Sequence, residues 1–298
     1  MPPAAAILRD ASSLAEGLAS GLRLGVFLTI LIVMAGWEWL HPRRPLSAAK
    51  PARWLTHLLL TFLNSAALRI CLPLTVLGAA LWAEQRSWGL LHQISLPASV
   101  ETVISFVLLD LAIYGQHVAS HHVPLLWRIH LVHHADLDID VTTGFRFHTV
   151  EILISAVFKV LVVVLLGAPA ASVLLFEIVL NGAAMFNHSN INLPQPIDRM
   201  LRWMLVTPDM HRVHHSVLRH ETDSNFGFNL PWWDYLFRTY RPQPELGHEG
   251  MTIGLPDLRN EQEVDRLPGL LMLPLRSLAR RHHRPATDAG RPEHPPEP

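Results

Sequence analysis

Long hydrophobic runs alternate with polar, histidine-rich segments along the chain. The runs cover about residues 24–40, 58–82, 100–114, 152–166 and 170–185. Their length and their scarcity of charge favour membrane-spanning helices over buried core helices. The sequence therefore predicts an all-α integral membrane protein with about four to five transmembrane helices.

One of these runs contains a charged residue, and a turn motif separates the last two. The run 58–82 contains Arg69 and is long enough for one tilted span or for a broken pair of helices. The last two runs flank Gly167-Ala-Pro169, which is typical of a turn. We expect these two runs to form a helical hairpin that returns the chain to the side it left.

The polar segments predict the membrane topology. A short basic loop contains Arg43, Arg44, Lys50 and Arg53 without an acid, and positively charged loops face the cytoplasm. Counting crossings from this loop places every histidine cluster on the cytoplasmic side. We expect a multi-pass protein whose histidine-rich helical cap, and therefore its active site, is cytoplasmic.

The chain is expected to have three parts. Residues 1–95 would be N-terminal membrane helices, 96–245 the catalytic domain, and 246–298 a C-terminal tail. The tail is rich in Pro, Arg and His after about Arg276, so we expect it to be partly disordered.

Composition narrows the function. Half of the residues are hydrophobic and 16% are charged, with a net charge of −1. This near neutrality does not suggest a nucleic-acid partner. The single cysteine, Cys71, cannot supply a thiolate or iron–sulfur cluster. The chain has 19 histidines, and histidine is the commonest metal ligand.

The histidines form three boxes. His117 and His121 are four apart, and the pattern His-x-x-His-His occurs at both 130–134 and 211–215. Such spacings place imidazoles on one helical face, where they can bind a metal. Single histidines 148 and 188 adjoin the predicted hairpin at the level of the boxes. Ten candidates suggest two metals, but imidazole suits iron, copper and zinc alike. The candidates are His117, His121, His130, His133, His134, His148, His188, His211, His214 and His215.

With these boxes in this order, residues 100–242 resemble the fatty acid hydroxylase/sterol desaturase superfamily. Further matching motifs are Phe145-Arg-Phe-His148, His188-Ser-Asn190, Asp223-Ser-Asn225 and Trp233-Asp234. One departure is His122, where family members often carry a basic residue.

The resemblance implies a non-haem di-iron centre, with zinc as a misloaded substitute. Such a centre uses O2 to hydroxylate or desaturate a C–H bond of a lipid, either a sterol or a fatty acyl chain. Electrons would come from a separate ferredoxin, rubredoxin or cytochrome, because the chain has neither a dinucleotide motif nor a recognisable haem domain.

Polar residues near the boxes are candidates to orient the imidazoles, since outer-shell carboxylates commonly do so. Each could instead be a helix cap or a surface group. The candidates are Asp110, Glu151, Asp209, Asp223 and Asn225. Arg128 and Arg146 are candidate contacts for lipid phosphates.

Other functions fit parts of the pattern. A histidine-rich metal transporter would need polar residues along its spans, whereas here the histidines gather at one end. A zinc-dependent lipid hydrolase or isomerase would use the same scaffold without O2. A haem protein would need two axial histidines, so ten are too many.

Overall fold

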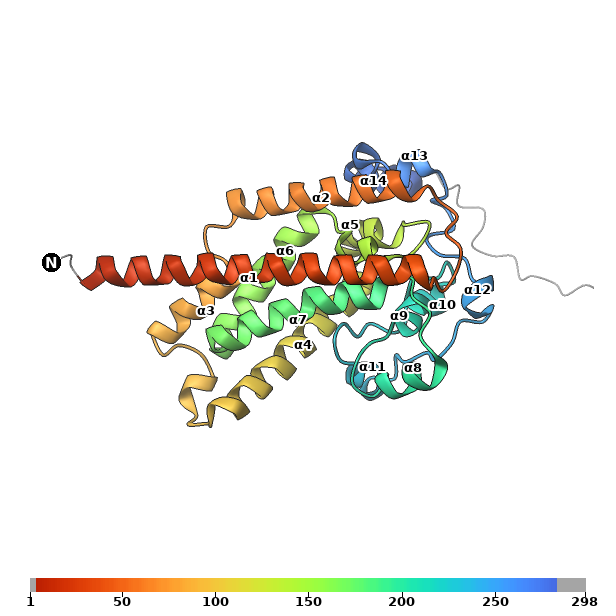
Figure 1. The fold of residues 1–298 in the computed structure, drawn as a ribbon. Coiled ribbons are helices and arrows are strands. Elements are labelled where there is room, and N and C mark those ends of the chain that lie inside the picture. The colour runs from red at the N-terminus through yellow and green to blue at the C-terminus, as the bar shows by residue number, and fades with distance from the viewer. Residues whose placement is uncertain (1–3, 283–298) are drawn as a thin grey trace, which may run out of the picture.

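The computed structural model describes the backbone of residues 4–282 and the side chains of residues 17–276. Regular structure in this range is helical, with isolated bridges such as Pro42 with Ile191 (Figure 1). The helices are α1 Ala4–Leu40, α2 Lys50–Cys71, α3 Val76–Gln85, η1 Leu91–Gln93, α4 Ala98–His122, α5 Pro124–His134, η2 Val141–Phe145, α6 Thr149–Leu166, α7 Ala170–His188, α8 Gln195–Leu201, α9 Pro208–His214, α10 Arg219–Thr222, α11 Trp232–Leu236, α12 Gly247–Gly250, α13 Glu261–Val264 and α14 Leu267–His282.

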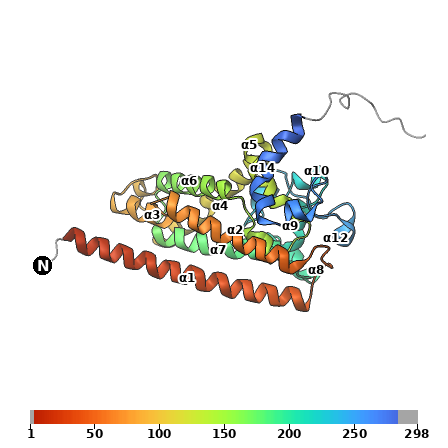
Figure 2. The same ribbon diagram turned by 90° about the horizontal axis from the view of Figure 1, so that it is seen from above.

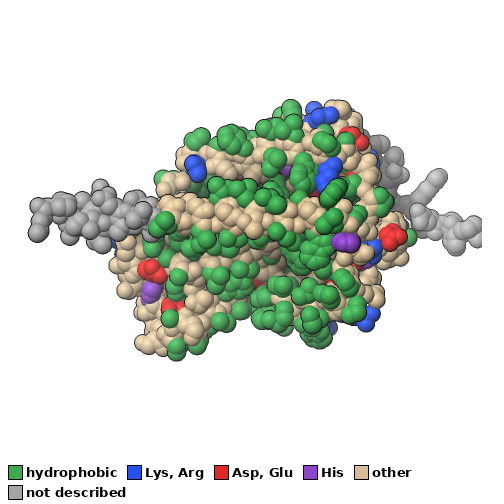
Figure 3. All heavy atoms as spheres, viewed as in Figure 1, with side chains coloured by type: hydrophobic (Ala, Val, Ile, Leu, Met, Phe, Trp, Pro, Cys, Tyr) green, Lys and Arg blue, Asp and Glu red, His purple; other side chains and the backbone are tan. Residues whose placement is uncertain are grey.

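Five helical segments are long and apolar enough to cross a membrane, which confirms the predicted all-α membrane class. They are Gly17–Leu40, Lys50–Gln85, Ala98–His122, Thr149–Leu166 and Ala170–His188. Large apolar side chains on them point outward: Ile32, Phe62 and Leu165 are 70%, 74% and 63% exposed. Figure 3 shows hydrophobic side chains spread over this face of the helical bundle. Such a surface suits lipid, so the chain is a multi-pass membrane protein.

The long second run is a broken pair, one of the two arrangements that its length allowed. Helix α2 ends at Cys71, Pro73 lies in the break, and α3 begins at Val76 with Thr75 as its cap. The predicted hairpin is also present. It turns at Gly167, whose φ of 66° is left-handed, and a Cβ there would lie 2.6 Å from Trp88 O. Glycine is therefore required at this turn.

Helix α4 continues beyond the predicted end of its apolar run at residue 114. Its last two turns carry His117 and His121 out of the apolar zone. The apolar run marks only the part of α4 that would contact lipid, whereas the helix itself continues to His122. The helix therefore delivers the first histidine box directly from the bundle.

Helix α5, η2 and the helices from α8 onward form a cap at one end of the bundle (Figures 1 and 2), whereas η1 lies beside the α6–α7 turn, next to Leu90, whose N donates to Leu165 O. Residues 246–276 are part of this cap, because Val264, Leu270 and Leu273 share a core with Leu131 of α5 and Leu60 of α2. We expect disorder after about Arg276, but α14 continues to His282, and residues 283–298 lie outside the described range. Helices α1 and α2 pack on α7 and α6, so the predicted N-terminal and catalytic parts share one packed bundle.

The basic loop after α1 lies at the cap end of the molecule. His41 O accepts a hydrogen bond from Asn192 N, and Arg43 N donates to Asn190 O. The loop and the histidine boxes are thus on the same end of the bundle. Its charges are largely compensated, since Arg53 contacts Asp136 and Lys50 lies 3.6 Å from Glu38.

Candidate metal centre

Nine of the ten candidate histidines come together at the junction between bundle and cap. They form two groups in which the candidate ligand atoms lie within 4.8 Å of one another, and all nine are buried. The first cluster is His117, His121, His130, His134 and His214. The second cluster is His133, His188, His211 and His215.

Each His-x-x-His-His box serves both clusters. His130 and His134, one helical turn apart on α5, enter the first cluster, while His133 enters the second. The box at α9 does the reverse: His211 and His215 enter the second cluster and His214 the first. Helix α4 completes the first cluster, and the last residue of α7, His188, completes the second. One helix therefore faces two sites at once.

Backbone carbonyls fix the ring orientation of several imidazoles. The Nδ1 atoms of His117 and His214 lie 2.8 Å and 2.7 Å from Phe226 O and Ser224 O. In the second cluster, His133 Nδ1 lies 3.2 Å from Arg146 O, and His188 Nδ1 lies 2.7 Å from Ala184 O. A carbonyl only accepts, so these Nδ1 atoms carry the proton and the Nε2 atoms keep their lone pairs.

This arrangement fits bound metal ions. His133 Nε2 and His188 Nε2 lie 3.1 Å apart, although both carry lone pairs. Such a contact is repulsive unless a cation shares the electrons. His130 Nε2 and His214 Nε2 are buried without a hydrogen-bond partner. Buried polar atoms normally have partners, and a metal ion would supply them.

Burial keeps the cap imidazoles neutral, as metal ligation requires. Removal from water lowers the pKa of His214 to about 3. Burial, together with neighbouring histidines, also lowers the pKa of His133, His134, His211 and His215 well below the usual range. Each ring is therefore a lone-pair donor at neutral pH.

Two carboxylates contact the first cluster. Glu151 Oε1 accepts a hydrogen bond from His130 Nδ1 at 2.6 Å, and Asp223 Oδ1 lies 3.4 Å from His121 Nδ1. Glu151 and Asp223 are thus two of the predicted candidates that lie beside an imidazole. A carboxylate behind an imidazole fixes its tautomer and raises its basicity as a ligand.

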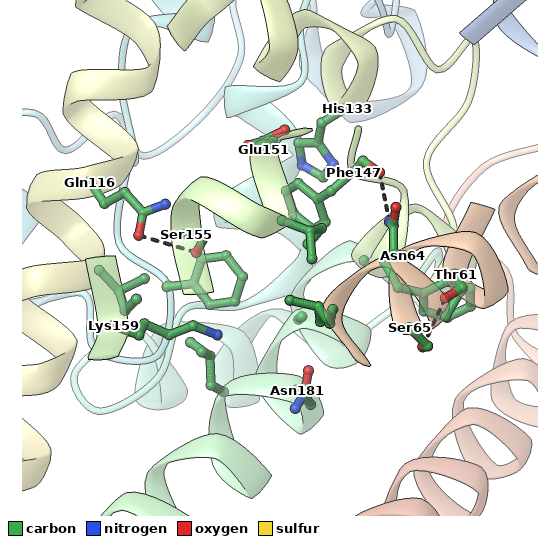
Figure 4. A pocket seen from close by; sticks show the side chains of 18 of the residues that line it. Thr61, Asn64, Ser65, Gln116, His133, Phe147, Glu151, Ser155, Lys159 and Asn181 are labelled. Atoms are coloured by element: carbon green, nitrogen blue, oxygen red, sulfur yellow. Dashed lines mark hydrogen bonds between the residues drawn. The ribbon is translucent and has the colours of Figure 1, made fainter. Parts of the chain in front are cut away.

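A cavity of about 440 Å³ leads from the bundle to both clusters. It lies among α1, α2, α4, α6 and α7, and His117, His130 and His133 line its inner end. Apolar side chains such as Phe145, Phe147 and Ile152 form its walls, and Figure 4 shows it from close by. A second, more polar hollow of about 690 Å³ reaches His121 from the cap. Trp127, Arg128, Arg219 and Asp223 line it.

Comparison with known proteins agrees with this site. Residues 102–239, which include all nine clustered histidines, match the fatty acid hydroxylase family model. These residues are therefore similar to the fatty acid hydroxylase family, and we call residues 102–239 the hydroxylase domain. No solved structure gives a significant match.

The curated relatives of the hydroxylase domain modify lipids by name. The chain is 30% identical to an ornithine lipid hydroxylase of Rhizobium tropici, over 52% of this chain and 47% of the relative. It is 27% identical to the alkylglycerol monooxygenase of Homo sapiens, over 50% of this chain and 32% of the relative. Cholesterol 25-hydroxylase of Rattus norvegicus is also 27% identical, over 48% and 47%. The chain thus matches about half or less of the length of these relatives.

His148 lies outside both clusters of the hydroxylase domain. It is the cap residue of α6, where its Nδ1 accepts a hydrogen bond from Val150 N at 3.2 Å. Its Nε2 lies 3.4 Å from Leu271 O on α14. Both ring nitrogens therefore have protein partners, unlike those of His130 and His214, whose Nε2 atoms have none among the described residues.

Asp110 does not reach a histidine either. Its carboxylate accepts hydrogen bonds from Asn229 Nδ2 and Trp233 Nε1, each at 2.8 Å. It thereby joins α4 to the segment that follows Phe226, whose carbonyl orients His117. The hydrogen-bonding capacity of Asp110, which lies in a predicted membrane span, is therefore met by residues of the cap.

Asp209 and Asn225 hold the cap together at a distance from the imidazoles. Asp209 pairs with Arg212 and lies 3.4 Å from both Arg43 Nε and His248 Nε2. Asn225 adopts a left-handed φ of 52°, and its side chain donates to Met210 O at 2.9 Å. Their side chains bond to other groups, and of the five polar candidates Glu151 and Asp223 are the ones whose side chains contact a clustered histidine in the described part of the chain.

A buried ionic network behind the second cluster was missed by the sequence analysis. Arg53 bonds Asp136 and Asp140 at 2.8 Å, and all three side chains are fully buried. Arg146 joins this network at 3.4 Å from Asp136 and donates to Val264 O. The expected lipid contact of Arg146 is therefore wrong: its side chain is enclosed, and its carbonyl orients His133. The signal for this network in the sequence was the alternation of Asp136, Asp138 and Asp140.

Proposed function

We propose that the chain is a membrane-bound di-iron hydroxylase that oxidises a C–H bond of a lipid. The supporting observation is that two buried clusters of neutral imidazoles meet the inner end of an apolar cavity in the membrane bundle. A lipid could enter such a cavity without passing through water. A catalyst that oxidises an unactivated C–H bond needs a site shielded from water.

The first cluster would hold one iron and the second cluster the other. Five and four imidazoles suit iron, and the choice of iron over zinc rests on similarity to the superfamily. When bound, the two irons supply the transfer of electrons to O2 that C–H oxidation requires. Zinc in the same sites would be a misloaded substitute.

The chain itself positions the lipid and the ligands. Phe145, Phe147 and Ile152 give the cavity apolar walls that exclude water and hold a hydrocarbon beside His117, His130 and His133. Glu151 Oε1 keeps the proton on His130 Nδ1. This contact leaves His130 Nε2 as the ligating atom.

The relatives favour hydroxylation over desaturation. Three of them are named as an ornithine lipid hydroxylase, an alkylglycerol monooxygenase and a cholesterol 25-hydroxylase. Their substrates differ, so the class of lipid rests on the cavity of this chain.

The electrons would come from a separate carrier of the ferredoxin, rubredoxin or cytochrome type. The polar hollow beside His121 supports an approach from the cap, away from the lipid cavity. We propose that this end is cytoplasmic, because the basic loop after α1 lies there.

The test is metal content and lipid oxidation by the purified full-length protein. We expect close to two irons per chain, and an oxidised lipid that appears only with O2 and a reduced carrier. Two zincs that resist replacement by iron, with no O2-dependent product, would favour a zinc-dependent lipid enzyme. A well-folded protein without bound metal would contradict the proposal and favour the transporter alternative.

A further inference from the structure

The lipid cavity contains a cation that the metal chemistry does not use. Lys159 lies on α6 within the membrane-spanning segment Thr149–Leu166 and lines the cavity. Figure 4 shows its side chain pointing inward, toward the part of the cavity that Asn181 also lines. An ionisable residue inside a membrane span is costly and commonly marks a binding site.

Lys159 differs from the other cation of this cavity. Arg23 on α1 is paired with Glu177 on α7 at 2.9 Å, so its charge is compensated. Lys159 makes no ion pair or hydrogen bond with the residues that the structure describes. The part of the cavity that Lys159 lines therefore holds one uncompensated positive charge in an apolar setting.

We infer that Lys159 binds the carboxylate of a single-chain lipid and so fixes how the substrate lies in the cavity. This inference rests on the proposed function, since it treats the cavity as the substrate site. One lysine matches one negative charge. A phosphate monoester would bring a charge of about −1.5 to −2 and leave part of it unpaired in low dielectric.

The position of Lys159 sets the distance between carboxylate and metal site. Lys159 is eight residues beyond Glu151 on α6, which corresponds to about 12 Å along the helix. Glu151 bonds His130 at the inner end of the cavity. A lipid anchored at Lys159 therefore presents a carbon several methylene groups away from its carboxylate to the histidines.

The cavity also has an entrance suited to such a lipid. Leu24 on α1 and Ser65 on α2 line it and are exposed, so it opens toward lipid between these two helices. Ser155 donates to Gln116 Oε1 at 3.3 Å, which leaves the Gln116 amide NH2 as a further donor along the wall. Gln116 and Ser155 lie on the same side of the cavity as Lys159 (Figure 4), so a carboxylate that reaches Lys159 has polar neighbours there.

The experiment is equilibrium binding of radiolabelled palmitic acid to the purified, detergent-solubilised full-length protein. Hexadecanol and hexadecyl phosphate serve as unlabelled competitors. We expect palmitic acid to bind, and both competitors to be at least about tenfold weaker, since an unpaired buried charge is costly. The variant Lys159→Met should weaken palmitic acid binding by at least about tenfold, and Lys159→Arg should largely restore it.

Leu161→Met is the matched control, because it places the same side chain on the lipid-exposed face of α6. It should bind palmitic acid like the unaltered chain. Removing a lone cation from a span should not impair folding, and a monodisperse elution profile with unchanged metal content checks this. Lys159→Gln replaces Lys159→Met if the latter aggregates.

The inference is overturned if palmitic acid does not bind, if Lys159→Met binds it normally, or if hexadecanol or hexadecyl phosphate competes as well as palmitic acid. The assay requires neither O2 nor a reductant, so it separates this inference from the proposed function. Lys159-dependent binding without lipid oxidation would contradict the hydroxylase. Lipid oxidation together with palmitic acid binding that is unchanged in Lys159→Met would contradict only the proposed role of Lys159.

Discussion

The two histidine clusters are neighbours, yet they are supported in different ways. The first has five imidazoles, and carboxylates stand behind two of them, Glu151 at His130 and Asp223 at His121. The second has four imidazoles, of which His133 and His188 are oriented by backbone carbonyls. Arg146, whose carbonyl contacts His133, also belongs to the ionic network of Arg53 and Asp136.

This difference has consequences for metal binding. A carboxylate behind an imidazole raises ligand basicity, whereas a neutral carbonyl does so less. The first cluster should therefore hold its ion more tightly. The second cluster, with fewer imidazoles, would leave more positions open on a bound ion. The contrast teaches that one pair of repeated sequence boxes can build two sites of unequal strength.

The largest effect should follow the loss of one ligand from either cluster. His214→Ala in the first cluster and His133→Ala in the second should each lower iron from about two per chain to about one. Hydroxylase activity should fall by more than the roughly 10- to 100-fold expected for an outer-shell partner. Metal analysis and lipid product analysis are the measurements. Full activity in either variant would contradict the ligand assignment.

The next largest effect concerns the carboxylates of the first cluster. Glu151→Gln keeps the size of the side chain but weakens the charge-assisted bond to His130. We expect a roughly 10- to 100-fold loss of metal affinity, read from competition with a chelator. Asp223→Asn should have the smaller effect, because its contact with His121 is longer, 3.4 Å against 2.6 Å. Equal effects, or none, would refute the ranking.

A smaller effect is a difference between the two clusters in the rate at which a chelator removes their iron. Under a slow chelator, we expect the iron of the second cluster to leave first, giving two phases in a time course of metal release. His215→Ala should remove the fast phase, and His134→Ala should remove the slow one. A single phase in the unaltered chain would mean that the two sites do not differ in strength.

The smallest effect should come from His148. Because it caps α6 and lies outside both clusters, His148→Ala should keep two irons per chain. We expect a loss of about 1 kcal/mol in the free energy of unfolding, typical of a lost helix cap. Thermal unfolding and metal analysis measure both quantities. Loss of one iron would restore His148 as a ligand and contradict the geometry.

The sequence by itself determined the membrane class and the helical hairpin, and it named all nine clustered histidines as candidates. Hydropathy reports which segments prefer lipid, and i, i+3 and i+4 spacing reports which side chains share a helical face. Both are local properties. They also made Glu151 and Asp223 reasonable candidates, since Glu151 follows His148 and Asp223 follows the box at 211–215.

Only the tertiary structure decided how the imidazoles divide. On α5, His133 and His134 are adjacent in sequence but project about 100° apart, so they reach different clusters. The partners of His148, Asp110 and Arg146 were equally hidden, because each lies far away along the chain: Leu271, Asn229 and Val264. Contacts between distant segments depend on how the cap folds over the bundle, which no local spacing encodes.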